Sequence, residues 1–173
     1  VVTPGSDDRG ARRIIAGEPR IDLLGHVRRL LVRGLGARTV YVDSGSQDSS
    51  VSFARSIGAE VVELDMSIPF TAARSRNAGL QRLLQLRPEL DYVHFIDGDC
   101  ELLPGWMEAA TLLLDSRPEV AVVAGRVIER HPEASLYNRL CQFDWDGGHR
   151  FGEVDSCGGI ALMRVSALRE AGG

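Results

Sequence analysis

Short apolar segments alternate with longer amphipathic ones along this chain, and that alternation constrains its fold more than any other feature. The expected strands are runs rich in β-branched or aromatic residues that end at turn residues: 39–42, 60–64, 92–96, 120–127 and 160–163. The expected helices have an apolar stripe: 21–34, 48–57, 71–86 and one beginning at Pro104. Strands that alternate with helices predict an α/β domain with a mostly parallel central sheet flanked by helices.

Charge and length narrow the function classes. The 173 residues suit one domain, and a net charge of -4 offers no general attraction for nucleic acid. No apolar run approaches the roughly 20 residues of a membrane-spanning helix. All 20 basic residues are arginine, so chemistry that requires a lysine is excluded, including pyridoxal-phosphate enzymes, P-loop NTPases and protein kinases.

The cysteines indicate the compartment. Cys100, Cys141 and Cys157 are odd in number and form no close pair, which is typical of a reducing environment. The first ten residues also lack the order of charged and apolar segments found in signal peptides. We therefore expect a cytoplasmic protein, and association with the cytoplasmic face of the membrane is left open.

Two carboxylates follow the apolar strand 92–96. Asp97 and Asp99 flank Gly98, and such hard oxygen donors suit Mg2+ or Mn2+, which take their remaining ligands from water and substrate phosphates. Ligands of α/β folds collect where strands end, so the position fits a binding site. A solvated Asp-Gly-Asp turn is the alternative interpretation of this motif taken alone.

Two further polar stretches border predicted elements. Asp43 and Gly45 lie in a turn between a strand and a helix, where a carboxylate can accept hydrogen bonds from a nucleobase or ribose, although helix capping also explains the turn. Arg76 interrupts the apolar pattern of the helix 71–86. Its forked donors suit an anionic or nucleoside group, and an ordinary surface arginine is the alternative.

In this order and spacing, the three stretches resemble family 2 glycosyltransferases of the GT-A fold. The chain reads DSGS at 43–46, RNAG at 76–79 and DGDCELLPGW at 97–106, and the stretches around 120–130 and 157–164 look similar as well. The resemblance runs from about residue 14 to residue 173. It implies a Rossmann-like GT-A domain that binds a nucleotide-diphosphate sugar.

The resemblance also implies roles for particular residues. Asp43, with Gly45 of the same motif, would contact the nucleobase, Arg76 would support the nucleotide, and Asp97 would lie near the ribose. Asp99 would ligate a Mn2+ or Mg2+ cofactor that bridges the diphosphate. The sugar would pass with inversion to a glycan, lipid or small-molecule acceptor, and nucleic acid is not an expected partner.

Two features depart from the family pattern. The first strand, at 14–17, lacks the usual nucleotide-contacting loop, and 1–4 is an alternative first strand with worse spacing to Asp43. The family's catalytic base lies beyond Gly173, so 1–173 is expected to be one GT-A domain truncated at its C-terminus, with 1–13 of uncertain role. If the base is instead within this chain, the candidates for it are Glu101, Asp144, Glu153 and Asp155.

Two other functions remain in competition. A catalytically silent nucleotide-sugar-binding module would also lack the base. A haloacid-dehalogenase-type phosphatase also has an Asp-x-Asp after a strand, but that motif usually opens the domain and is accompanied by a lysine that this chain lacks. The four histidines, at positions 26, 94, 131 and 149, have no metal-ligand spacing and are expected to be structural.

Overall fold

The computed structural model describes residues 2–3, 39–98, 100–145, 152–154, 157 and 159–172. Its strands are β1 Val2–Thr3, β2 Val40–Asp43, β3 Glu60–Glu63, β4 Tyr92–Asp97, β5 Val122–Ala124 and β6 Ile160–Arg164. Its helices are α2 Ser50–Ser56, α3 Ala72–Leu86, α4 Trp106–Ser116, α5 Leu136–Trp145 and α6 Val165–Glu170.

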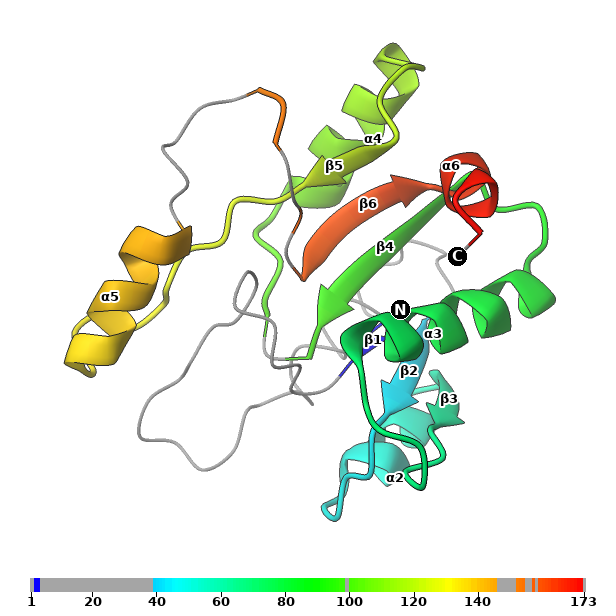
Figure 1. Ribbon diagram of the computed structural model, residues 1–173, viewed down its shortest axis with the longest axis horizontal. Coiled ribbons are helices and arrows are strands. Elements are labelled where there is room, and N and C mark those ends of the chain that lie inside the picture. Colours follow the sequence, from blue (N-terminus) through cyan, green and yellow to red (C-terminus); the bar gives the residue numbers. More distant parts are fainter. Residues whose placement is uncertain are drawn as a thin grey trace.

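The strands form a single six-stranded sheet in the order β3-β2-β1-β4-β6-β5 (Figure 1). β3, β2, β1 and β4 are mutually parallel, whereas β6 runs antiparallel to both of its neighbours, β4 and β5. The predicted mostly parallel α/β fold is confirmed. The parallel strands all end at one edge of the sheet, where their polar residues collect.

Helices cover both faces of the sheet. On one face, α3 and α6 pack on Val42, Phe95 and other residues of a buried cluster. On the other face, α2 lies over Tyr41 and Ile96, and α4 lies over Leu162. Alternate residues of a strand point to opposite faces, so Asp97 falls on the α3 face and Asp43 on the α2 face.

Most expected elements are present, with changes at their ends. β2, β3, β4, β6, α2 and α3 lie within one or two residues of their predicted bounds, and the predicted strand 120–127 shortens to Val122–Ala124. Pro104 lies in the turn before α4, whose N-cap is Gly105. The predicted helix 21–34 lies outside the described residues. α5 and α6 are additional helices.

The first strand differs from the preferred alignment. Val2–Thr3 fills the position between β2 and β4, with Val2 opposite both Tyr41 and Ile96. The preference for 14–17 at this position is therefore wrong. The spacing between residues 1–4 and Asp43 does not exclude 1–4 as the first strand, because the sequence between Thr3 and β2 is long. Residues 14–17 themselves lie outside the described residues.

Candidate functional site

The candidate site lies where β2 and β4 end. Asp43 is the last residue of β2 and Asp97 the last residue of β4, and β1 separates the two strands. Two strand spacings place their backbones about 10 Å apart. Both side chains are buried, with Asp43 3% and Asp97 0% exposed. The structure therefore brings two of the predicted carboxylates to one edge of the sheet.

Arg76 joins Asp97 across that edge. Its Nη2 atom lies 3.1 Å from Oδ1 and 3.3 Å from Oδ2 of Asp97, and its side chain is 22% exposed. The buried carboxylate thus has a counter-charge, without which its desolvation would be costly. The ion pair links Arg76 to the Asp-Gly-Asp motif, a contact that the sequence did not predict.

The local sequence of α3 explains why Arg76 faces Asp97. The hydroxyl of Thr71 caps the helix by accepting a hydrogen bond from the Arg74 amide at 3.1 Å. Ser75, Gly79 and Leu80 form part of the buried face, and Arg76 lies at the edge of that face near the helix start. The guanidinium of Arg74 instead donates to the carbonyls of Ile68 and Asp65, so it holds the preceding loop.

Asp43 organises the DSGS turn. Its Oδ2 accepts hydrogen bonds from the amides of Gly45, at 2.9 Å, and Ser46, at 3.0 Å. Its Oδ1 accepts one from the hydroxyl of Tyr41 at 3.4 Å. Gly45 has a φ of 92°, a left-handed conformation that favours glycine. The turn that follows β2 is therefore fixed by Asp43 and Gly45 together.

Tyr41 is a member of this site that the sequence did not reveal. It is fully buried beneath the turn, and burial is the main cause that raises its pKa to about 12. The hydrogen bond to Asp43 acts in the same direction. Its apolar strand context hid this role, because a tyrosine in a buried strand is usually a core residue.

The turn after Asp97 is tightly held. The amide of Asp97 donates to the carbonyl of Gly159 at 2.9 Å, and the amide of Cys100 donates to the carbonyl of Asp97 at 3.0 Å. Gly98 and Cys100 are buried. Asp99, the predicted metal ligand, lies outside the described residues. Within the described ranges, no group of three His, Cys, Asp or Glu side chains is placed to hold a metal ion.

Glu101, one of the acidic candidates, already has a partner. Arg130 donates to its Oε2 at 2.6 Å, which links the segment after the Asp-Gly-Asp motif to the loop after β5. Glu153 is exposed. The side chain of Asp144 and the residue Asp155 lie outside the described part of the chain. No base is identified among these four residues.

The loop after β5 contains another feature that sequence patterns missed. Glu129 is 3% exposed, and its Oε1 accepts a hydrogen bond from the His131 amide at 2.8 Å. Its Oε2 is buried and has no hydrogen-bond partner among the residues that the structure describes. A single glutamate in a loop carries no periodic signal, so its burial could not be predicted.

His94 is a structural residue, as expected. The indole Nε1 of Trp106 donates to its Nε2 at 3.0 Å, so this imidazole nitrogen acts as an acceptor. The bond joins β4 to the first turn of α4. The ring of Trp106 also packs closely against Gly125, at the position that a side chain there would occupy. The loop after β5 therefore contacts the start of α4.

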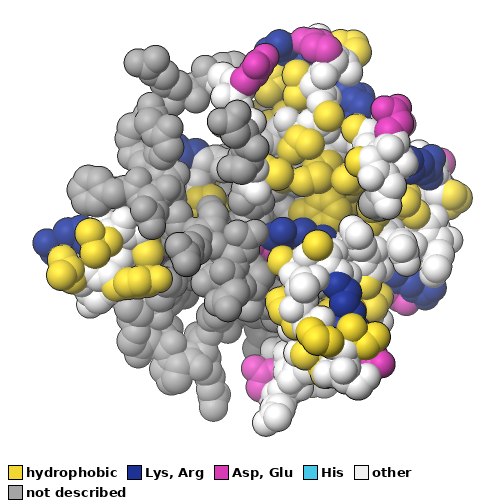
Figure 2. Space-filling model, viewed as in Figure 1, with side chains coloured by type: hydrophobic (Ala, Val, Ile, Leu, Met, Phe, Trp, Pro, Cys, Tyr) yellow, Lys and Arg dark blue, Asp and Glu magenta, His cyan; other side chains and the backbone are white. Residues whose placement is uncertain are grey.

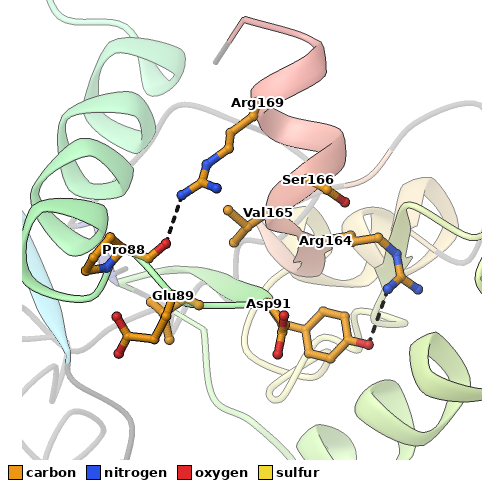
Figure 3. A pocket seen from close by; sticks show the side chains of 9 residues that line it. Pro88, Glu89, Asp91, Arg164, Val165, Ser166 and Arg169 are labelled. Atoms are coloured by element: carbon orange, nitrogen blue, oxygen red, sulfur yellow. Dashed lines mark hydrogen bonds between the residues drawn. The ribbon is translucent and has the colours of Figure 1, made fainter.

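A small pocket lies at the opposite edge of the sheet (Figure 3). Its volume is about 270 Å3, and it lies between the residues that lead into β4 and the start of α6. Arg169 donates to the carbonyl of Pro88, and Arg164 donates to the hydroxyl of Tyr92 and the carbonyl of Leu114. Because both arginines are hydrogen-bonded to neighbouring parts of the fold, we do not assign the pocket to the candidate site.

Comparison with solved structures identifies similar folds. Glucosyl-3-phosphoglycerate synthase of Mycobacterium tuberculosis matches with a TM-score of 0.51 and 22% identity over 96% of this chain and 57% of that chain. A complex of that enzyme with Mn2+, UDP and phosphoglyceric acid gives a TM-score of 0.52. A mannosyltransferase of Pyrobaculum calidifontis, in complex with GDP-Man and Mn2+, matches with a TM-score of 0.58 and 17% identity over 99% and 46% of the two chains.

These matches show the GT-A fold. This chain spans about half the length of the solved structures that it resembles. A search of curated protein sequences finds no significant match. The profile of Glycosyl transferase family 2 matches residues 24–172, which include every polar motif at the sheet edge. The chain belongs to glycosyl transferase family 2.

Proposed function

We propose that this chain is the donor-binding part of an enzyme that transfers a sugar from a nucleoside diphosphate to an acceptor, with inversion at the anomeric carbon. The observation that carries the proposal is that Asp43 and the Arg76–Asp97 ion pair lie at the same edge of a GT-A sheet. Two of the similar structures named above contain UDP or GDP-Man together with Mn2+, which supports the proposed class of donor.

The nucleoside is proposed to bind along the ends of β2 and β4. The spacing of about 10 Å between these ends suits a group the size of a nucleoside. Asp43 fixes the turn through Oδ2, and its Oδ1 has acceptor capacity left for the base. Gly45 keeps the turn in the shape that holds Asp43, since its φ of 92° favours glycine.

Asp97 is proposed to accept hydrogen bonds from the ribose. An ionised carboxylate only accepts hydrogen bonds, which suits it to the donor hydroxyls of a ribose. Arg76 also fixes the orientation of the carboxylate before the donor arrives, which lowers the entropy cost of binding. Its role is then to position Asp97 as well as to offset the charge of the nucleotide.

A Mn2+ or Mg2+ ion fits the donor set at this edge. Asp99 is the proposed ligand, because Asp97 is already paired with Arg76. Few protein ligands are needed, since these ions take others from water and phosphates. When bound, the ion stabilises the negative charge of the departing nucleoside diphosphate.

A base must remove the proton of the acceptor hydroxyl. Glu101 is a poor candidate because it is engaged by Arg130 at 2.6 Å. The acceptor is proposed to be a glycan, lipid or small molecule with a free hydroxyl group. A catalytically silent module that only binds the donor is the second candidate, supported by the absence of an assigned base among the described residues.

A cytoplasmic location is proposed for the enzyme. Cys100, Cys141 and Cys157 all lie in the described part of the chain and form no disulfide, as expected for a protein in a reducing compartment. Among the described residues, no helix is both long and apolar enough to span a bilayer.

Release of the nucleoside diphosphate tests the proposed activity. The natural full-length protein is supplied with a panel of UDP- and GDP-sugars, Mn2+ and candidate acceptors. We expect turnover that requires both the metal and the acceptor. Donor binding without turnover in the full-length protein would favour the silent module.

A further inference from the structure

The loop that joins β3 to α3 begins at the same edge of the sheet as the DSGS turn. The amide of Leu64 donates to the carbonyl of Asp43 at 2.9 Å, which extends the pairing of β3 with β2 by one residue. The loop ends at Thr71, the N-cap of the helix that carries the arginine of the candidate site. It therefore borders this site on the side of β3.

Met66 of this loop packs against the DSGS turn. A Cβ at Gly45 would lie 3.3 Å from Cγ and 3.9 Å from Sδ of Met66, so the methionine side chain occupies the space that a side chain at Gly45 would need. The same turn is held by Asp43 through the amide of Gly45. Met66 is 47% exposed, so it keeps an accessible apolar surface beside the turn.

The loop around Met66 is held in place by hydrogen bonds. The amide of Ser67 donates to Oδ1 of Asp65 at 2.9 Å. The guanidinium of Arg74 donates to the carbonyls of Asp65, at 2.7 Å, and Ile68, at 3.0 Å, which are the residues on either side of the methionine. A contact that is already in place costs less entropy on binding than one that a mobile loop must form.

An exposed methionine on a loop is common and by itself indicates no ligand. Met66 differs because it lies against the turn whose carboxylate is proposed to contact the base. Figure 2 shows hydrophobic side chains at the surface below the start of α3, where Figure 1 draws this loop. The methionine side chain is unbranched and polarisable, and it packs favourably against aromatic rings. A nucleobase is such a ring.

The order of the strands separates two sizes of base. With the ribose at Asp97 and the base at Asp43, the nucleoside runs from β4 across β1 to β2, and β3 is the next strand in that direction. That strand lies about 4.8 Å further along the edge. The single ring of a pyrimidine ends near Asp43, whereas the fused second ring of a purine extends the base towards β3 and Met66.

We propose that Met66 is a specificity-determining residue for the donor, and that its side chain packs on the outer ring of a purine base. It contributes to the binding of GDP and hardly to that of UDP. This inference rests on the proposed function, because it requires the nucleoside to lie along the ends of β2 and β4.

Calorimetric titration of GDP, UDP and bare pyrophosphate into the natural full-length protein, with Mn2+, tests this role. We expect Met66→Ala to raise the Kd of GDP about fivefold, because a lost apolar contact at a partly open site costs less than the tenfold or more of an enclosed pocket. The Kd of UDP should change less than about twofold, since its ring does not reach Met66. The Kd of pyrophosphate should not change. Met66→Leu keeps an apolar side chain of similar volume and should retain most of the affinity for GDP.

Leu112→Ala is the matched control, because Leu112 is an apolar residue on α4 that is 69% exposed. It should leave all three Kd values unchanged, and the thermal melts of all variants should match that of the wild type.

Four results would overturn the role of Met66 and leave the proposed function intact. They are equal weakening of GDP and UDP binding in Met66→Ala, no effect of that change on either nucleotide, a loss in Met66→Leu as large as in Met66→Ala, and a wild type that binds UDP but not GDP. A wild type that binds neither nucleotide would instead contradict the proposed function, and this inference with it.

Discussion

The guanidinium of Arg76 lies within 3.3 Å of both carboxylate oxygens of Asp97, 21 positions along the chain. The contact connects the first half of α3 to the last residue of β4 and is largely buried. It pairs the first carboxylate of the Asp-Gly-Asp motif with a protein cation. Asp97 and Asp99 are therefore expected to have different roles, although the sequence motif treats them alike.

Removing one member of this pair should be costly. We expect Arg76→Ala to lower the free energy of unfolding by about 3 kcal/mol, because it leaves the buried Asp97 carboxylate without its counter-charge. The double variant R76Q/D97N should lose less free energy of unfolding than the losses of Arg76→Gln and Asp97→Asn added together. It should still bind UDP or GDP poorly. Denaturant unfolding and calorimetry of nucleotide binding measure the two effects.

Arg82→Gln is the matched control for that experiment. Arg82 pairs with Glu60, but both side chains are about one-third exposed, so the pair should contribute less than about 1 kcal/mol. Equal destabilisation by Arg76→Ala and Arg82→Gln would contradict the special role of the buried pair. Additive single changes in R76Q/D97N would contradict the coupling.

Replacing Asp43 should weaken binding of the nucleoside and leave binding of the diphosphate unchanged. Asp43→Ala removes the acceptor of the Gly45 and Ser46 amides, so we expect a loss of about 1–3 kcal/mol in stability and weaker binding of UDP and GDP, with or without metal. Binding of bare pyrophosphate should not change. An equal loss of affinity for pyrophosphate, measured by the same calorimetry, would argue against a base or ribose contact.

Gly45 and Gly58 provide a matched pair for the turn. Both have positive φ, 92° and 82°, so alanine at either position should cost about 1–2 kcal/mol. A Cβ at Gly45 would also lie 3.3 Å from Cγ of Met66, whereas one at Gly58 meets nothing within 4 Å. Only Gly45→Ala should lower nucleotide affinity. A similar loss in Gly58→Ala would show that general destabilisation, and not the turn, is responsible.

Tyr41 should give the protein an alkaline limit. Its pKa is about 12 in the folded chain, against 10 for a tyrosine exposed to water, so the unfolded chain loses the proton first. The contribution of Tyr41 to the free energy of unfolding is then fully present below pH 10. It falls by up to about 3 kcal/mol as the pH rises towards 12. The chain has no lysine, so no ammonium group of a side chain titrates in this window.

Unfolding measured between pH 9 and 12 tests this expectation. Tyr41→Phe should flatten the pH dependence, while Tyr137→Phe, which changes an exposed side chain of α5, should keep the wild-type slope. An unchanged slope in Tyr41→Phe would mean that another group sets the alkaline limit.

The elements predicted from sequence were those in which local pattern and packing agree. β4 is an apolar run between turn residues, and α3 has both an apolar stripe and the Thr71 cap, so each is recognisable without its neighbours. α5 was missed because its apolar stripe faces outward and its buried face includes Asn138, which reverses the usual pattern. β1 has two residues and depends on pairing with β2 and β4, a long-range property.

The site could be predicted in part. The sequence places Asp43 and Asp97 at the ends of two strands. Because parallel strands end at the same edge of a sheet, their shared location could be predicted. The pairing of Arg76 with Asp97 could not be predicted, since it depends on which face of the sheet α3 covers. The same holds for Arg130 with Glu101, where two loops meet. These contacts arise from tertiary packing and leave no periodic signal in the sequence.

Titration of UDP and GDP into the natural full-length protein, with and without Mn2+, tests the central claim most directly. The account predicts that Mn2+ strengthens binding at least about tenfold, a difference of about 1.4 kcal/mol, and that Asp99→Asn removes this gain while leaving metal-free binding unchanged. If Asp99→Asn keeps the full effect of Mn2+, the assignment of a metal-dependent donor site to this sheet edge is contradicted.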